Sequence, residues 1–161
     1  MDSRIDLVDY LRDIAGLFPN QRTIEAVVYE RGREFAAPAK PRPVGIRKGA
    51  NHQCYRNAYS ILFTQPGLRY VEGFAADGRF GFPMQHAWVI DEKDNVIETT
   101  WMESGLAYYG IVLEIQFINE VLFEKRTYGV LDFASKIFRE RYALAPRKIF
   151  PDSEVFSCQR T

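Results

Sequence analysis

The sequence predicts an α+β protein in which a helix that begins at Cys54 packs against an antiparallel sheet. Three observations support this fold class. Apolar residues recur at helical spacing near both ends of the chain, short runs with strand-like patterns occupy the middle, and charged or glycine-containing turns separate those runs. Strands joined by short turns pair as an antiparallel meander, so we expect one sheet with helices packed on it.

Two helices are predicted before the cysteine. Residues 3–17 carry apolar side chains at helical spacing, and Pro19 ends that pattern. Residues 24–29 form a short apolar run that fits either a helix or a strand, and we favour a helix. Residues 36–50 are rich in proline, glycine and basic residues, which indicates a loop that leads the chain to Cys54.

The elements after this loop alternate between short strands and helices. We predict a helix over 54–63, strands over 68–75, 85–91, 95–101 and 111–115, a turn or flap over 76–83, and helices over 117–126 and 130–143. The last helix is expected to bury a stripe made of Leu131, Ala134, Ile137, Phe138 and Tyr142. No segment repeats, so a single domain over residues 1–161 is expected, with its motif-bearing core at about 44–116.

Size and composition narrow the classes of function. The chain has 161 residues, of which 47% are apolar and 26% charged, and its formal net charge is zero. This is a globular composition, and the absence of a basic excess gives no reason to expect a nucleic-acid partner. Apolar stretches are too short to cross a bilayer, the start lacks the apolar run of a secretory signal, and two cysteines make no disulfide framework. We therefore expect a cytoplasmic protein without a membrane partner, of a kind that suits a bacterial or phage gene.

Three residues stand in the local structures that thiol catalysis requires. Cys54 opens a predicted helix, His86 lies in a predicted strand, and Glu98 lies in the next strand. A helix N-terminus favours the thiolate, a histidine can pair with it and protonate the leaving group, and a carboxylate can hold the other ring nitrogen. We therefore predict a nucleophile, a base and an orienting acid in that order. The alternative for Cys54 alone is a buried structural thiol.

The turn between the two strands tests this prediction. If Asp91 pairs with Asn95, then His86 and Glu98 are diagonal neighbours on one face of the hairpin. A slip of one residue would put Glu98 on the opposite face, so the prediction requires a loop of three or five residues. Asp91 is the rival acid, but it lies on the opposite face of the strand that carries His86.

Further groups are expected around the nucleophile. The backbone N–H of Cys54 is the natural donor to an oxyanion, and the side-chain amide of Asn51 or Gln53 is the second candidate. Trp88 is a candidate contact for the substrate, as a wall of the cleft or part of the core. The basic loop around Lys40 is either solvated or steers an acidic substrate. His52 and Cys54 lack a second pair with zinc-ligand spacing, so no metal or organic cofactor is expected.

The motifs of residues 50–101 resemble the transglutaminase-like branch of the papain-like thiol enzymes. In that superfamily a cysteine opens a helix, and a strand of the form Tyr-Val-x-Gly-Phe follows, as at residues 70–74. A His-Ala-Trp-Val strand comes next, as at 86–89, and then an acid followed closely by threonine, as at 98–100. The family's acid is usually aspartate, and its cysteine is commonly followed by small residues or tryptophan, whereas here the acid is glutamate and Tyr55 follows Cys54.

The resemblance implies a papain-like fold and covalent chemistry through a thioester. Members of the superfamily include peptidases, amidases, acyl transferases, cross-linking enzymes and inactive binding modules. For this chain we predict a thiol hydrolase that acts on a protein or peptide-like amide. A transglutaminase-type acyl transferase with the same triad, and an inactive module that binds a protein or peptide, are the alternatives.

Overall fold

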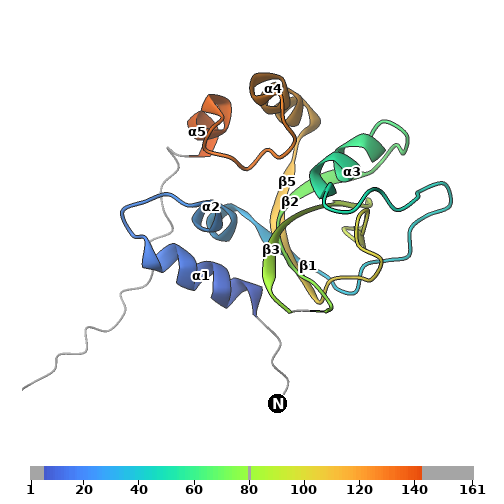
Figure 1. Cartoon of the computed structure of the whole chain (residues 1–161), viewed down its shortest axis with the longest axis horizontal. Coiled ribbons are helices and arrows are strands. Elements are labelled where there is room, and N and C mark those ends of the chain that lie inside the picture. The colour runs from blue at the N-terminus through green and yellow to red at the C-terminus, as the bar shows by residue number, and fades with distance from the viewer. Residues whose placement is uncertain (1–5, 80, 143–161) are drawn as a thin grey trace, which may run out of the picture.

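The computed structural model describes residues 6–79 and 81–142, and these residues form an α+β fold (Figure 1). Its helices are α1 (Leu7–Leu17), α2 (Ile24–Arg31), α3 (Cys54–Ile61), α4 (Ile115–Lys125) and α5 (Lys136–Tyr142). Its strands are β1 (Arg33–Phe35), β2 (Arg69–Ala76), β3 (Pro83–Ile90), β4 (Val96–Ile97) and β5 (Ala107–Leu113). The strands pair antiparallel in the order β1-β5-β2-β3-β4, and the sheet curls into a half-barrel.

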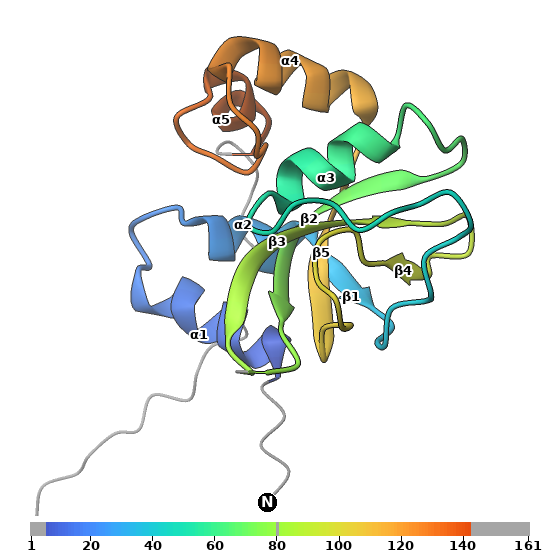
Figure 2. The ribbon, with the colours of Figure 1, turned by 45° about the vertical axis from the view of Figure 1, so that its right-hand side comes forward.

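The two faces of the sheet are covered differently. The convex face and the helices α1 to α5 share the larger apolar core, to which β2 contributes Tyr70 and Phe74. The concave face holds a smaller cluster that includes Val71, Trp88 and Tyr108. Figure 2 shows the helices gathered along one side of the curled sheet, while the long loop before α3 runs around the other. The concave face is therefore left to loops.

Local sequence explains where the helices begin. Asp6 caps α1 by accepting hydrogen bonds from the backbone N–H groups of Val8 and Asp9, and Thr23 caps α2 in the same way. No side chain caps the start of α3 at Gln53. The positive end of the α3 dipole is therefore left to the thiol of the next residue.

Glycine is required where the central strands approach most closely. A Cβ atom on Gly73 would lie 2.2 Å from the carbonyl oxygen of Tyr109 in the neighbouring strand. Gly73 is paired with His86 across the ladder between β2 and β3. The close approach of β2 to β5 therefore occurs at the residue of β2 that pairs with His86.

Most of the predicted elements are confirmed, and two are shorter than predicted. The strand expected over 95–101 ends at Ile97, because the N–H groups of Thr100 and Trp101 bond to the Glu98 carboxylate instead of a neighbouring strand. The helix expected over 130–143 begins only at Lys136, because Ser135 caps it by accepting a hydrogen bond from the N–H of Phe138. Of its predicted stripe, Phe138 and Tyr142 are buried, Leu131 and Ile137 are half-buried, and Ala134 is exposed.

Other predictions differ in smaller ways. The strand predicted from residue 111 begins at Ala107, and β1 has no counterpart in the prediction because a three-residue strand gives too little pattern to recognise. The predicted helix over 24–29 is confirmed as α2. Cys158, residues 3–5 and residue 143 lie outside the described residues. None of the described helices combines the length and the apolar character needed to cross a membrane.

Candidate active site

Cys54 is the first residue of α3, and the loop before it is tied to the segment after β4. The side chain of Asn57, one turn into the helix, donates to the carbonyl oxygen of Ala50 (2.8 Å) and to Oγ1 of Thr100 (2.9 Å). The N–H of Gly49 donates to the carbonyl oxygen of Thr99 at 2.8 Å. These bonds fix the half-buried Cys54 beside the residues that follow Glu98.

His86 and Glu98 form a buried pair on the concave face. Nε2 of the imidazole lies 3.2 Å from Oε1 and 3.0 Å from Oε2 of the carboxylate, and both residues are less than 5% exposed. Val89 pairs with Ile97, and the N–H of Asp91 donates to the carbonyl oxygen of Asn95. This is the register required by the sequence prediction, so the prediction that His86 and Glu98 share a face is confirmed.

The carboxylate of Glu98 has further donors besides the imidazole. The N–H groups of Thr100 (2.8 Å) and Trp101 (3.1 Å) donate to Oε1, and the hydroxyl of Tyr108 donates to Oε2 at 3.2 Å. Burial opposes ionisation of Glu98, but the hydrogen bonds and the positive charge of His86, with the two backbone donors, lower its pKa below the usual value. Glu98 is therefore an ionised, fixed acceptor for His86.

His86 also interacts with the nucleophile. Because Nε2 faces Glu98, the other ring nitrogen is the one left to interact with the Cys54 side chain. Burial alone would lower the pKa of His86, but the hydrogen bonds to Cys54 and Glu98 and their negative charges raise it to about 9. The indole of Trp101 stacks on the imidazole with ring centroids 3.9 Å apart and planes 11° apart. The geometry thus favours an imidazolium that is paired with the Glu98 carboxylate beside the Cys54 side chain.

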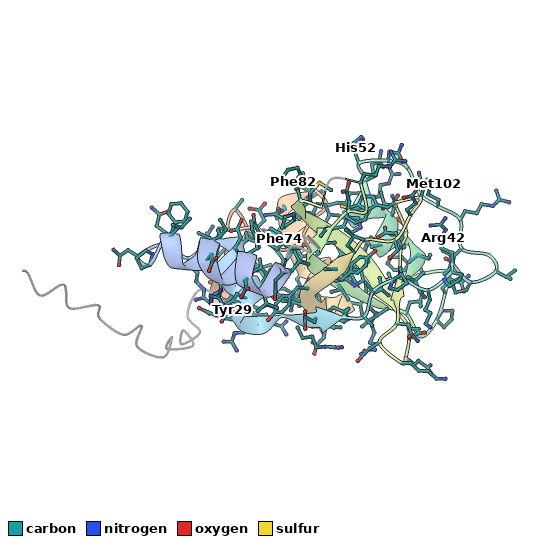
Figure 3. The ribbon with its side chains drawn as sticks, turned by 90° about the horizontal axis from the view of Figure 1, so that it is seen from below. Tyr29, Arg42, His52, Phe74, Phe82 and Met102 are labelled. Atoms are coloured by element: carbon teal, nitrogen blue, oxygen red, sulfur yellow. The ribbon has the colours of Figure 1, made fainter. Side chains whose placement is uncertain are left out.

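A cavity of about 510 Å³ opens at this group and is lined by residues of three loops and the start of β3. Its walls are Asn51, His52, Cys54, Asp77, Gly78, Arg79, Met84, Gln85, His86, Thr100, Trp101, Met102 and Glu103. Figure 3 shows His52 and Met102 at the same edge of the molecule, with Phe82 further along it. The half-buried Cys54 thus borders a cavity, and the buried His86 forms part of the wall of that cavity.

The lining of the cavity distinguishes between the remaining candidate residues, which are Asn51, Gln53 and Trp88. Asn51 lines it, whereas Gln53 does not, and the Gln53 side chain accepts a hydrogen bond from Arg56. Trp88 is fully buried beneath the site and is absent from the walls, because its position on β3 points it into the concave core. Of the two places expected for Trp88, the structure shows the core and not a wall of the cavity, and Trp101 is the indole that borders the cavity.

Two supporting groups were not predicted in their roles. Tyr108 contacts Glu98 from β5, and no local pattern places that strand within reach of the acid. Arg42 of the basic loop donates to the carbonyl oxygens of Glu98 (3.1 Å) and Trp101 (3.3 Å), so it supports the backbone around the acid. Lys48 of the same loop donates to Oδ1 of Asn51 at 2.6 Å. The loop's cations are thus partly structural.

Two other expectations concern residues near the site. Asp91, the rival acid, accepts hydrogen bonds from Lys93 and Asn95 within its own turn and takes no part in the His86 pair. Among residues 6–79 and 81–142, no group of three or more histidine, cysteine, aspartate or glutamate side chains could hold a metal ion.

Comparisons of the chain with protein-family models, with curated proteins and with solved structures found no match.

Proposed function

We propose that this protein is a cysteine-dependent hydrolase of peptide-like amides, with the papain-like, transglutaminase-like arrangement of nucleophile helix and strands. One observation carries the proposal: a single buried imidazole contacts both the thiol at a helix start and an ionised carboxylate, beside an open cavity. A structural cysteine needs none of these partners. Perturbed titratable groups gathered in a cavity are typical of catalytic sites.

The first half of the reaction forms a thioester. The Cys54 thiolate attacks the carbonyl carbon of the amide, a C–S bond forms and the oxygen becomes an oxyanion. Collapse of this intermediate breaks the C–N bond, and the leaving amine takes its proton from the His86 imidazolium. Glu98 holds Nε2 throughout, so the other ring nitrogen stays directed at the reacting atoms.

The second half returns the enzyme to its starting state. Neutral His86 takes a proton from water, the water oxygen adds to the thioester carbonyl and the C–S bond breaks. The products are a carboxylic acid and the original thiolate–imidazolium pair. An amine in place of water gives transfer, which is the alternative activity for the same triad.

Asn51 is the better second donor to the oxyanion, beside the N–H of Cys54. Lys48 occupies its carbonyl oxygen, so the NH₂ end of the amide is left to donate, and Asn51 lines the cavity next to the nucleophile. Asn51→Ala is expected to slow acylation without slowing alkylation of the thiol, because alkylation develops no oxyanion.

The proposal is tested with a mixture of blocked peptides, incubated with the full chain carrying Cys158→Ser so that Cys54 is the only thiol. We expect free carboxylates from hydrolysis, and hydroxamates when hydroxylamine competes with water for the thioester. Cys54→Ala provides the matched control and should form neither. Amine-linked products without hydrolysis would favour the transferase. No product dependent on Cys54, together with an ordinary thiol reactivity, would contradict catalysis and favour the binding module.

A further inference from the structure

The second buried glutamate, Glu72, lies on the opposite face of the sheet from Glu98. It is 1% exposed and accepts hydrogen bonds from the hydroxyl of Tyr70 (2.5 Å) and from the N–H groups of Val130 (2.7 Å) and Leu131 (2.9 Å). Val130 and Leu131 belong to the linker between α4 and α5, here residues 126–135. The carboxylate therefore anchors this linker to the central strand.

The anchored linker contacts the nucleophile helix. A Cβ atom on Gly129 would lie 3.7 Å from the ring of Tyr55, so the ring packs across the backbone of the linker. Gly129 has a φ of +96°, a conformation that only glycine adopts without strain, and Lys125 donates to its carbonyl oxygen at 2.8 Å. In Figures 1 and 2 the linker lies beside the first turn of α3. The linker is thus a fixed platform for Tyr55.

Tyr55 also joins the helix of the nucleophile to the strand of the base. It follows Cys54 directly, and its hydroxyl lies 3.4 Å from Oε1 of Gln85, the residue that precedes His86. Burial, together with the charges of Glu72 and Cys54, raises the pKa of Tyr55, so its hydroxyl remains a donor at every working pH. Tyr55 stands at the position after the cysteine, where the sequence departs from the family pattern. Its hydrogen bond to Gln85 therefore connects α3 to β3.

We propose that Tyr55 and Glu72 are positioning residues that set the distance between Cys54 and His86. Glu72 fixes the linker, the linker supports the ring of Tyr55, and the hydroxyl of Tyr55 holds α3 against β3. The inference rests on the proposed function, since it concerns the geometry of the thiol–imidazole pair. Neither Tyr55 nor Glu72 lines the cavity, so both act on the thiol–imidazole pair through their neighbours.

The test uses the rate of alkylation of Cys54 by iodoacetamide in the full chain carrying Cys158→Ser. At about pH 6 the rate depends on pairing with His86, whereas at about pH 10 the thiolate forms without that partner. We expect Glu72→Gln to lower the rate about tenfold and Tyr55→Phe about threefold at the lower pH, with both equal to the parent at the higher pH. In Glu72→Gln an NH₂ group faces a backbone N–H, so the linker must shift.

The matched control is Glu124→Gln. Glu124 caps the start of α5 through Ser135 and the N–H of Lys136, so it binds the same region by the same chemistry without supporting Tyr55. Its alkylation rates should equal those of the parent. Tyr55→Phe keeps the ring and tests the inference even if Glu72→Gln fails to fold.

The outcomes separate this inference from the proposed function. Rates that fall at the lower pH alone support it. If the thiol of the parent is activated but the variants react at the parent's rate, the positioning role is overturned and the proposed function stands. The same holds if the variants lose rate equally at both pH values. A parent whose thiol shows no activation overturns both.

Discussion

Two glutamates are buried in the same sheet, and their differences show what makes a carboxylate part of a reactive site. Glu98 faces the concave side and Glu72 the convex side, and each accepts a hydrogen bond from a tyrosine hydroxyl, of Tyr108 and Tyr70 respectively. Each also accepts two backbone N–H groups. Burial and neutral donors are therefore common to both.

The two carboxylates differ in one partner, because only Glu98 contacts a histidine. Burial dominates for Glu72 and raises its pKa despite its donors, whereas contact with His86 overcomes burial for Glu98 and lowers its pKa. His86 in turn connects Glu98 to Cys54 and to the cavity. A buried carboxylate thus holds the backbone in one case and a proton-transfer group in the other.

The largest expected effect lies on the convex face. Glu72→Ala leaves the N–H groups of Val130 and Leu131 and the hydroxyl of Tyr70 without their acceptor, so the free energy of unfolding should fall by about 4 kcal/mol. Urea denaturation followed by circular dichroism measures this loss. A loss within about 0.5 kcal/mol would show that the linker does not depend on this anchor.

On the concave face, His86→Ala should suppress the reactivity of the thiol. The alkylation rate of Cys54 at about pH 6 is expected to fall about 100-fold, because an unpaired thiol is almost fully protonated there. The rate at about pH 10 serves as the internal control and should be preserved. Equal rates at the lower pH in parent and variant would mean that no ion pair forms.

Glu98→Gln should have a smaller effect on the same measurement. The amide still accepts hydrogen bonds but no longer stabilises the imidazolium, so we expect about a tenfold lower rate at about pH 8. The pH at which His86 loses its proton should fall below the value of about 9 expected for the parent. Asp91→Asn removes the rival acid and provides the control, with no change expected.

The smallest predicted effect is a difference between the two glutamates in how each makes the free energy of unfolding depend on pH. The lowered pKa of Glu98 gives a stabilisation that is present above the unfolded value of about 4.3 and is lost as the pH falls through the folded pKa. The raised pKa of Glu72 gives the opposite sign, since its contribution is greatest below about 4.3 and is lost as the pH rises through the folded pKa.

The two glutamine variants should therefore differ from the parent with opposite slopes. Unfolding free energies measured in urea across the acid range should diverge from the parent in opposite directions for the two variants. Parallel slopes for Glu72→Gln and Glu98→Gln would mean that the two carboxylates titrate alike.

The same contrast explains what the sequence could predict. Cys54, His86 and Glu98 were found because each needs only local information: a helix start, the alternation of one strand, and the length of one turn. The anchor at Glu72 was missed because it depends on where the chain returns about sixty residues later. Tyr108 was missed as a partner of the acid for the same reason, since strand order is not a local property.

The two shortened elements have a related cause. The Glu98 carboxylate takes the N–H groups that would have continued β4, and the Ser135 hydroxyl accepts the N–H of Phe138 and so sets the start of the last helix. At both places apolar periodicity predicted the correct type of element. It gives no indication of a side chain that binds backbone N–H groups and so limits the length of that element. Both errors in length therefore fall where a side chain binds backbone N–H groups.

The central claim is that His86 is an imidazolium held between Cys54 and Glu98, and its titration tests this most directly. The chain has two histidines, so nitrogen-15 spectra of the rings are simple, and His52→Gln identifies the second signal. We predict that both ring nitrogens of His86 stay protonated until about pH 9. A ring that loses its proton near the ordinary value of about 6.5, or is neutral throughout, would contradict the ion pair and the function built on it.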